Sequence, residues 1–458
     1  MLTPKPAAVE LRDVPASDIW KTINLASKLI SDKVGLIQGI NHGIFRAQDP
    51  QTIAMGAGVQ DLSTFSEILN SSKAGGGGER VELALAATIG EAVERYCMNF
   101  YDKEKLVFAS YREVQNDAVH PDLVRYYSRE QIATARFKNT KYFSEDSKIH
   151  WEWGYSLTFK RHRLVPATQV YLNYNLDDHE ENPGRNASTG LAAGASLEEA
   201  ILSGLFEVVE RDAVAILWHH RKIGPRIRID NTELIEMLED RFHIDHPSVD
   251  VKIFDIRLDI PIPSVFAVMQ RPSEFGPILC VSSVTRLDPK EAVRKSMREM
   301  GQATPYMRYL YHQLDDWEPA SDFSNITTFD HHFMLYSKRP ELIPEAMGFC
   351  DNVEDEILLS EIPDYATGRV LSDIEYCVNA LRELGFEVIV SDITTPEISD
   401  LGLHTVRVLI PGLVPLHGNH NYPYLGLKRL HEIPRKLEWQ ESGWDTESGL
   451  NSYPHPFP

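Results

Sequence analysis

Two short runs of charged residues share the pattern E-x-x-E-R, one at residues 91–95 and the other at 207–211. A helix turns about 100° per residue, so the two glutamates of each run lie about 60° apart on one face. Carboxylates this close repel each other, by roughly a few tenths of a kcal/mol on a surface and by more when buried. Divalent cations such as Mg²⁺ bind carboxylate oxygens, commonly together with substrate phosphates. The pattern therefore indicates two acidic helices that hold metal ions and a nucleotide.

A third glutamate, Glu199, lies eight residues before Glu207, which leaves it on the same helix face as Glu207 and Glu210. Each run also has a simpler interpretation, because Glu, Arg and Ala are good helix formers and a charged, solvated face needs no function. Ser196 and Glu199 likewise match a helix-capping box, S-x-x-E. Two copies, each behind a segment of glycine and other small residues, favour the metal site.

The elements that must position these glutamates follow from hydrophobic spacing and from glycine. The runs "SSKAGGGGER" (71–80) and "ENPGRNASTGLAAGAS" (181–196) are predicted as loops, and each leads into a long helix that carries E-x-x-E-R. Further helices are predicted over 18–35, 288–312 and 373–385. Strands are predicted over 165–175, 251–257, 263–269, 277–284, 386–394 and 404–412. The polar segments 103–150 and 315–370 are predicted to be irregular.

Composition limits the class of protein. The chain has 458 residues, 43% hydrophobic and 25% charged, enough for one large globular domain or two. The formal net charge of −21 argues against nucleic acid or an anionic membrane as the main partner. No run of about 18 apolar residues and no secretion signal is present, and the four cysteines form no C-x-x-C pair. We therefore expect a cytoplasmic protein with reduced cysteines.

The stretches "GGGGERVELALAATIGEAVERY" and "NASTGLAAGASLEEAILSGLFEVVERDA" resemble the YcaO family, as do "RLDPKEAVRKSMREMGQ" and "VRVLIPGLVPLH". The resemblance implies an α+β fold with mixed β-sheets, in which long glutamate-bearing helices surround an ATP and Mg²⁺ site. It runs from about residue 70 to the end of the sequence. We therefore expect a catalytic domain over 71–458 and an N-terminal segment, 1–70, packed on it.

The resemblance assigns the nucleotide-binding and metal-binding glutamates to Glu91 and Glu94 in the first helix, and to Glu199, Glu207 and Glu210 in the second. It also assigns nucleotide contacts to Arg95, Ser188, Arg211, Glu299 and Gln302.

Three positions depart from the family pattern. Many members have a lysine between glycines where Gly77 stands, and an asparagine where Thr189 follows Ser188. Ala195 replaces a polar residue that some members have after the second glycine-containing segment.

The last five residues, "PHPFP", resemble the P-x-P-x-P ending of the azoline-forming cyclodehydratases within this family. The alternative is an ordinary extended tail. Prolines restrict the backbone, so this ending could place the carboxylate of Pro458 near a reaction centre, and Pro458 is the predicted catalytic group. Four histidines are further candidates for the general base: His219, His220, His417 and His420.

The implied reaction converts Cys, Ser or Thr residues of a ribosomal precursor peptide into thiazoline or oxazoline rings, with phosphorylation of the backbone amide oxygen by ATP. The expected partners are the precursor peptide, a separate precursor-binding protein, a flavin-dependent azoline dehydrogenase and a second copy of the chain. Two alternatives stay open: thioamidation with a sulfur donor, and a non-catalytic scaffold that presents a precursor peptide.

Overall fold

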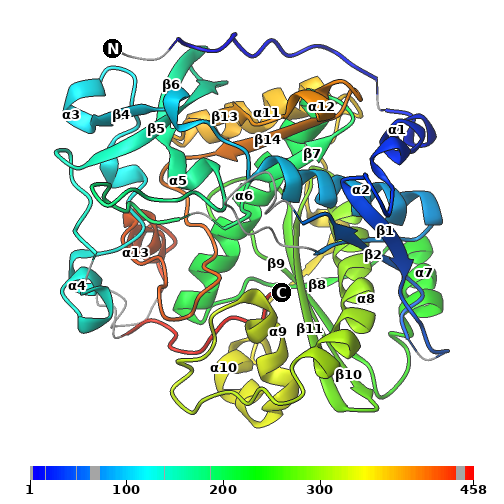
Figure 1. Ribbon diagram of the computed structural model, residues 1–458. Helices are drawn as coiled ribbons and strands as arrows, with labels where there is room; N and C mark the ends of the chain where they lie inside the picture. The colour runs from blue at the N-terminus through cyan, green and yellow to red at the C-terminus, as the bar shows by residue number, and fades with distance from the viewer. Residues whose placement is uncertain are drawn as a thin grey trace.

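The computed structural model describes residues 4–15, 17–47, 49–61, 73–138, 140–185, 187–439 and 449–458. In these residues the strands form three sheets, and long helices fill the space between them (Figure 1). This arrangement confirms the predicted α+β fold with mixed β-sheets. None of the helices in the described part of the chain combines the length and the hydrophobicity that a membrane crossing requires.

The first sheet has the order β1-β2-β3, with β1 Ile37–His42, β2 Ile53–Val59 and β3 Lys73–Gly78, and all of its pairings are antiparallel. Helix α2 (Val81–Cys97) follows β3 directly and packs on β3 and β2. Helix α1 (Ile19–Ala26) lies against α2 on the outside. The segment predicted as a glycine loop is thus a strand over 73–78, followed by a bend at 79–80.

The glycines of β3 allow a close approach that larger residues would prevent. A Cβ atom added at Gly76 would lie 2.4 Å from the backbone nitrogen of Thr88 in α2. On the other side of the strand, a Cβ atom at Gly77 would lie 2.6 Å from Oε1 of Gln302. The strand is therefore held between two helices, and this packing, rather than the conformational freedom of glycine, explains the glycine run.

The second sheet has the order β4-β5-β13-β14-β7, and β6 pairs with β5. Three helices connect to these strands along the chain: α5 (Ala167–Val170) follows β6, α11 (Val370–Glu383) precedes β13, and α12 (Pro396–Ser399) lies between β13 and β14. The strands are β4 Val107–Ser110, β5 Lys148–Ser156, β6 Arg161–Pro166, β7 Leu191–Gly194, β13 Ile389–Asp392 and β14 His404–Leu409.

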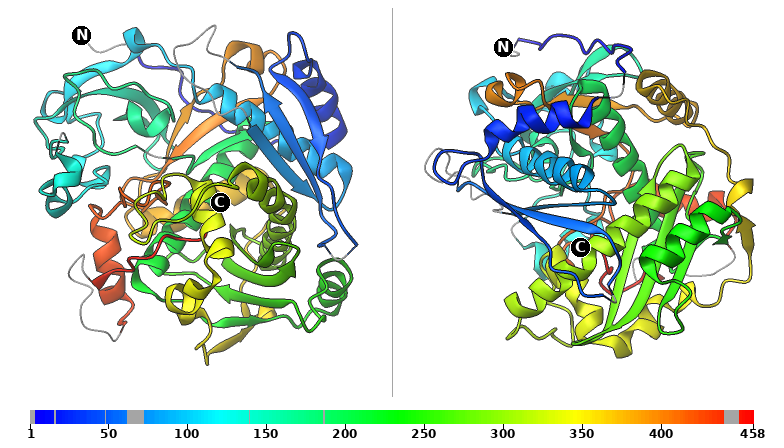
Figure 2. Two further views of the ribbon diagram at one scale, coloured as in Figure 1. Left: turned by 60° about the horizontal axis from the view of Figure 1, so that its bottom comes forward. Right: turned by 90° about the vertical axis from the view of Figure 1, so that its right-hand side faces the viewer.

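The third sheet has the order β11-β10-β9-β8-β12. Its longest pairing is the antiparallel hairpin of β10 and β11, in which Ser264 lies opposite Thr285. Helix α8 (Pro289–Gln313) packs on β10 and β11 and also reaches β3 of the first sheet (Figure 2). The strands are β8 Arg226–Arg228, β9 Asp250–Asp255, β10 Ser264–Ser273, β11 Gly276–Thr285 and β12 Glu356–Leu358, and the nearby helices are α7 Thr232–Phe242, α9 Phe329–Lys338 and α10 Ile343–Met347.

Helix α6 (Leu197–His220) connects the second and third sheets through the centre of the molecule. It packs on β7 and β14 at one end and on β10 and β11 at the other. Ser196 caps it by accepting the backbone N–H of Glu199, which is one half of the predicted capping box, while the Glu199 carboxylate accepts from Ser17. Most of its residues are buried on all sides, so charged groups on this helix must find partners inside the protein.

Several predicted elements are confirmed, namely the strands β9, β10, β11, β13 and β14 and the helices α2, α6, α8 and α11. The strand predicted over 165–175 is wrong: β6 ends at Pro166, which lacks a backbone N–H, and a helical turn follows. The segment 315–370 is not irregular, because α9, α10 and β12 lie within it. The segment 103–150 contributes β4 and the start of β5, and 181–196 contains β7.

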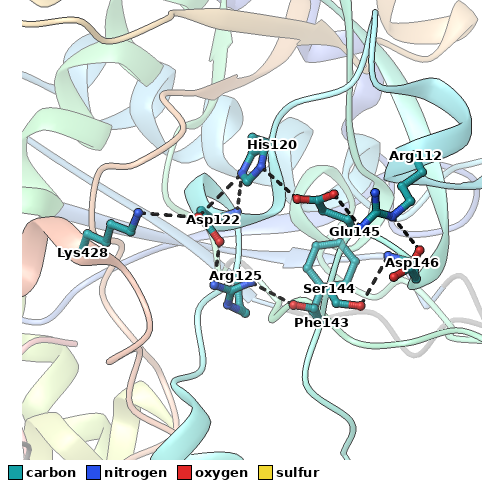
Figure 3. Close-up of polar contacts among 9 residues, drawn as sticks. All are labelled: Arg112, His120, Asp122, Arg125, Phe143, Ser144, Glu145, Asp146 and Lys428. Atoms are coloured by element: carbon teal, nitrogen blue, oxygen red, sulfur yellow. Dashed lines mark hydrogen bonds and ion pairs between the residues drawn. The ribbon is translucent and has the colours of Figure 1, made fainter.

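A polar network gives the segment 111–146 its shape (Figure 3). Asp122 accepts a hydrogen bond from Arg125 at 2.7 Å, and Lys428 of α13 (Lys428–Lys436) lies 3.5 Å from the same carboxylate. His120 lies between Asp122 and Glu145. These partly exposed contacts join residues 120–125 to α13 and to residues 143–145. The short helices α3 (Tyr111–Val114) and α4 (Arg129–Ile132) come before and after residues 120–125 in the chain.

Candidate active site

The two E-x-x-E-R runs form the same local structure. In each, the first glutamate accepts a backbone N–H from a glycine ahead of the helix: Glu91 from Gly75 at 2.9 Å and Glu207 from Gly190 at 3.0 Å. In each, the arginine four residues later faces that glutamate, with N···O distances of 3.1 Å for Arg95 and 3.7 Å for Arg211. The repeated sequence therefore produces a repeated unit, a glycine-containing segment followed by an acidic helix.

The second glutamate of each run connects its unit to another part of the chain. Glu94 accepts the backbone N–H of Ala193 in β7 at 2.9 Å, so it joins the first unit to the second. Glu210 accepts the hydroxyl of Ser283 at 2.9 Å and the backbone N–H of Thr285 at 3.2 Å, both from β11. These bonds bring α2, α6 and the third sheet together at one point.

Helix α8 adds a fifth carboxylate. Glu299 accepts the hydroxyl of Ser282 at 3.1 Å and the amine of Lys295 at 2.6 Å. Gln302, one turn later, faces Gly77 of β3 and occupies the space in which a side chain at position 77 would lie. A lysine at position 77 would therefore have no room while Gln302 keeps its position. Lys295 is a cation of the site that was not predicted from the sequence, although its four-residue spacing to Glu299 is typical of an ion pair on a helix.

The electrostatics show a surplus of negative charge. Burial, together with the charges of Glu91 and Glu207, raises the pKa of Glu94 to about 8, against the opposing effect of the Ala193 N–H and Arg95. Burial also raises the pKa of Glu210 to about 7. In contrast, Lys295, Arg286 and Arg211 outweigh the effect of burial at Glu299 and lower its pKa.

The donor set of this cluster fits Mg²⁺. Mg²⁺ prefers carboxylate oxygens and is usually shared between protein carboxylates and substrate phosphates. Two of the carboxyls carry raised pKa values without a cation, which means that added positive charge would be stabilising there. The residues present for such an ion are Glu91, Glu94, Glu207, Glu210 and Glu299.

Glu199 lies nearer the start of α6 than Glu207 and Glu210. It is eight residues before Glu207, which corresponds to about 12 Å along the helix axis. Its two carboxylate oxygens accept the backbone N–H and the hydroxyl of Ser17, each at 3.0 Å. It lines a cavity of about 250 Å³ whose other walls are α1, α2 and the end of β7, including Ile23, Gly90 and Gly194. The structure thus places Glu199 beside a mostly apolar space next to the carboxylate cluster.

Ser188 lies in the turn before β7, where its carbonyl accepts the N–H of Leu191 at 2.8 Å. Arg407 of β14, 1% exposed, fixes this turn by donating to the carbonyls of Ala187, Thr189 and Gln169. Burial lowers the pKa of Arg407 to about 10, and the nearby charge of Glu207 acts in the opposite direction. Sequence reasoning missed Arg407, because an arginine in a strand carries no signal of its partners.

The end of the chain lies at the centre of the molecule, close to this cluster (Figures 1 and 2). Phe457 is 3% exposed, and its ring centre is 5.7 Å from the guanidinium carbon of Arg211. Pro458 follows it and is exposed. The catalytic role predicted for Pro458 stays a prediction.

The four histidine candidates for the general base share one feature, a lowered pKa. Burial is the main cause at each, and it lowers the pKa of His219 to about 3 and that of His420 to about 4. A base with such a low pKa holds a proton poorly near neutral pH. These histidines therefore fit a structural role better than a proton-transfer role.

Comparison with known proteins agrees with this geometry. Residues 75–414 match the family described as YcaO cyclodehydratase, ATP- and Mg²⁺-binding. A solved heterocyclase in complex with substrate and cofactor has a TM-score of 0.77 at 25% identity, over 98% of this chain and 59% of that chain. This chain therefore spans less than two thirds of that heterocyclase.

Two further solved structures share the fold. YcaO from Methanopyrus kandleri, bound with AMPPCP and Mg²⁺, has a TM-score of 0.58 at 19% identity, over 86% of this chain and 88% of that one. A chain of the E. coli microcin synthetase McbBCD complex with pro-MccB17 bound has a TM-score of 0.59 at 17% identity, over 92% and 96%. The matched region covers most of the chain and includes both acidic helices, so this protein belongs to the YcaO family of ATP- and Mg²⁺-binding cyclodehydratases.

Proposed function

We propose that this chain is the ATP-dependent cyclodehydratase of a peptide-modifying system, which converts Cys, Ser or Thr residues of a ribosomal precursor peptide into azoline rings. One observation carries the proposal. The bond from the Ala193 N–H to Glu94 joins the two E-x-x-E-R units into a single carboxylate cluster with surplus negative charge. A cluster of this kind suits a polyphosphate that arrives with divalent cations.

The adenosine part of ATP fits the cavity beside Glu199. Its walls are mostly apolar, as a purine requires, and the Glu199 carboxylate provides a polar group at its edge. Gly90 and Val93 line the cavity on the same helix that carries Glu91 and Glu94. A nucleotide in this cavity would therefore direct its phosphates toward the glutamate cluster.

Glu91, Glu94, Glu207 and Glu210 are proposed to hold Mg²⁺, with Glu299 beside them, and the metal-binding role of Glu199 stays a prediction. When bound, the ion neutralises phosphate charge as it develops during phosphoryl transfer. Arg211 and Lys295 complement this charge from the protein, while Arg95 keeps Glu91 in place. The Gly75 and Gly190 N–H groups fix the first glutamate of each unit, so the chain positions the nucleotide before the peptide arrives.

The proposed reaction begins when the side-chain sulfur or oxygen of the peptide attacks the preceding amide carbon and loses its proton. The amide oxygen of this tetrahedral adduct then attacks the γ-phosphorus of ATP, and ADP leaves. The carbon–oxygen bond breaks and phosphate departs with the bonding electrons. The amide nitrogen forms the C=N bond and releases its proton, which completes the ring. Phosphorylation is needed because an amide oxygen is otherwise a poor leaving group.

The proposed partners are a precursor peptide, a separate precursor-binding protein and a flavin-dependent azoline dehydrogenase. The support comes from a relative, the microcin synthetase, which is solved as a complex with a pro-peptide bound. Residues 71–458 are the proposed catalytic domain. The N-terminal segment is proposed to pack on it, since β1 and β2 extend the sheet of β3 and Arg12 donates its backbone N–H to Glu198 at 2.6 Å.

The test is ATP turnover with synthetic leader-bearing peptides that contain cysteine in the core region. We expect ADP and phosphate release to match, one for one, the loss of one water mass per ring in the peptide. Glu207→Gln should abolish both signals without unfolding the protein, since the amide is similar in shape but a poor substitute for an anionic ligand. Ring formation without ATP, or full turnover by Glu207→Gln, would refute the proposal.

A further inference from the structure

Three buried histidine rings meet where the end of the chain packs against α9. His332 of α9 and His455 of the "PHPFP" segment are both fully buried, and His417 is 3% exposed. The rings of His332 and His455 are stacked, with centres 3.9 Å apart and planes 9° apart. His417 meets His455 edge-on at 5.1 Å. This cluster is separate from the glutamates and has no role in the steps proposed above.

The cluster holds the backbone of the tail segment, which we define as Leu450–Pro458. His332 donates from Nδ1 to the carbonyl of His455 at 2.8 Å. Two residues of neighbouring elements hold it further upstream: Tyr336 donates its hydroxyl to the carbonyl of Pro454 at 2.5 Å, and Trp218 donates its indole N–H to the carbonyl of Tyr453 at 3.0 Å. His455 itself donates from Nε2 to the carbonyl of His417 at 2.7 Å. Consecutive carbonyls of the tail segment are thus each bound by a different side chain.

The geometry favours such a clamp over a metal site. Nitrogens of the three histidines lie within 4.8 Å of one another, a spacing that could admit an ion. A metal–imidazole bond lies in the plane of the ring, along the nitrogen lone pair. The parallel, stacked planes of His332 and His455 direct their lone pairs side by side and not toward a common point. His332 is also committed through Nδ1 to the tail backbone.

The clamp determines where Phe457 lies. Two residues after His455, the Phe457 ring packs against Arg211 at 5.7 Å and against Phe266 at the same distance. Arg211 faces Glu207 and Glu210, and Phe266 lies opposite Ser283, the residue that donates to Glu210. A shift of the tail segment by one residue would therefore remove the ring that covers Arg211.

We propose that His332 is a positioning residue for ring formation, which sets the register of the tail segment and so holds Phe457 against Arg211 beside the carboxylate cluster. This inference rests on the proposed function for its kinetic consequence. The structural part, that His332 determines where Phe457 lies, does not depend on it. His332 acts through the tail segment and does not touch the carboxylates, so its loss should affect peptide processing and spare Mg-ATP binding.

The experiment places 4-fluorophenylalanine at position 457 and follows it by ¹⁹F NMR in the full chain. His332→Leu removes both the donor and the stacked ring, and we expect the resonance to move toward that of the free amino acid. His332→Asn keeps a donor near the position of Nδ1, so it should restore part of the shift. His331→Leu is the matched control, because His331 stacks on Trp317 at 4.6 Å and contacts Thr327, away from the tail.

The kinetic arm uses the cysteine-containing peptide that the parent protein cyclises. His332→Leu should lower kcat by at least about tenfold, as small misplacements near a reaction centre do, with Mg-ATP affinity unchanged. Added to a deletion of Pro454–Pro458, it should cause no further loss, since both changes act through the same segment. An unchanged ¹⁹F resonance in His332→Leu, or an additive loss in the double variant, would overturn the inference. Absence of ring formation by the parent together with its precursor-binding partner would instead refute the proposed function and leave the ¹⁹F result to decide the clamp.

Discussion

The substitution Glu94→Gln should have opposite effects on two properties: it should stabilise the metal-free protein and weaken Mg-ATP binding. The raised pKa of about 8 means that Glu94 is mostly protonated at pH 7 when no cation is present, whereas the same group is ionised in the unfolded chain. At about 1.4 kcal/mol per pKa unit, the interval between 4.5 and pH 7 corresponds to roughly 3.5 kcal/mol of lost stability, and partial solvent access reduces this to about 1–3 kcal/mol. Glutamine cannot ionise, and its carbonyl can still accept the Ala193 N–H. We therefore expect Glu94→Gln to stabilise the metal-free protein by about 1–3 kcal/mol.

Because folding raises the pKa of Glu94, the stabilisation by Glu94→Gln should depend on pH in a defined direction. A carboxyl whose pKa is raised on folding has no penalty below the unfolded pKa of 4.5, and the penalty grows as the pH rises to the folded pKa. The gain in Tm for Glu94→Gln over the parent should therefore be near zero at pH 4.5 and largest at pH 8. The same variant should lose the Tm increase that Mg-ATP gives the parent, because it lacks an anionic ligand.

Thermal melts from pH 4.5 to 8, with and without Mg-ATP, measure both effects. Glu375→Gln on α11 is the control, since Glu375 is exposed and its removal should change neither quantity. A Glu94→Gln protein that is less stable than the parent at pH 7 without metal would show that the electrostatic reasoning is wrong. A full Mg-ATP response would show that Glu94 is not a ligand.

Three other outcomes are expected. Gly76→Ala should lower both the Tm and the Mg-ATP affinity, measured by calorimetry, because its Cβ atom would meet the backbone of α2; Gly39→Ala, with nothing within 4 Å, should change neither. Arg407→Lys should lower the free energy of unfolding in urea by about 2–4 kcal/mol, because one amine cannot serve three buried carbonyls; equal stability would contradict this. Burial lowers the pKa of His332 to about 3, so this group should lower the free energy of unfolding by about 1.4 kcal/mol for each pH unit below 6.5. In urea titrations at pH 7 and 5.5, the free energy of unfolding of His332→Leu should therefore change less between the two pH values than that of the parent.

The acidic part of the site could be predicted from the sequence because the spacing of residues along a helix determines which of them share a face. Glutamates three residues apart must share a face, and the structure brings Glu91, Glu94, Glu207 and Glu210 into one cluster. Glu199 satisfies the same angular rule and lies about 12 Å before Glu207 along the helix axis, beside the cavity. Its role as a metal ligand stays a prediction.

The parts that the sequence did not predict depend on packing between distant segments. Glycines normally indicate a loop, yet the glycine run is strand β3 because α2 and Gln302 press on its two faces. Helix α9 lies in a segment with a polar sequence that does not indicate a helix. Its buried His332 and Tyr336 find their hydrogen-bond acceptors only in the tail segment. The carbonyl partners of Arg407 come from residues more than 200 positions away, which no local pattern records.

Two walls of the cavity beside Glu199, which we propose as the nucleotide site, differ in how easily they open. Helix α6 is buried along most of its length between two sheets, so its amide hydrogens should exchange with solvent only when the whole protein unfolds. Helix α1 has eight residues, of which Ile23 and Ala26 are buried, and it lies on the outside of α2. Its amides should exchange through local opening, far sooner than those of α6. The entry and release of a nucleotide would then follow the opening rate of α1, and the carboxylates on α6 would stay in place through each cycle.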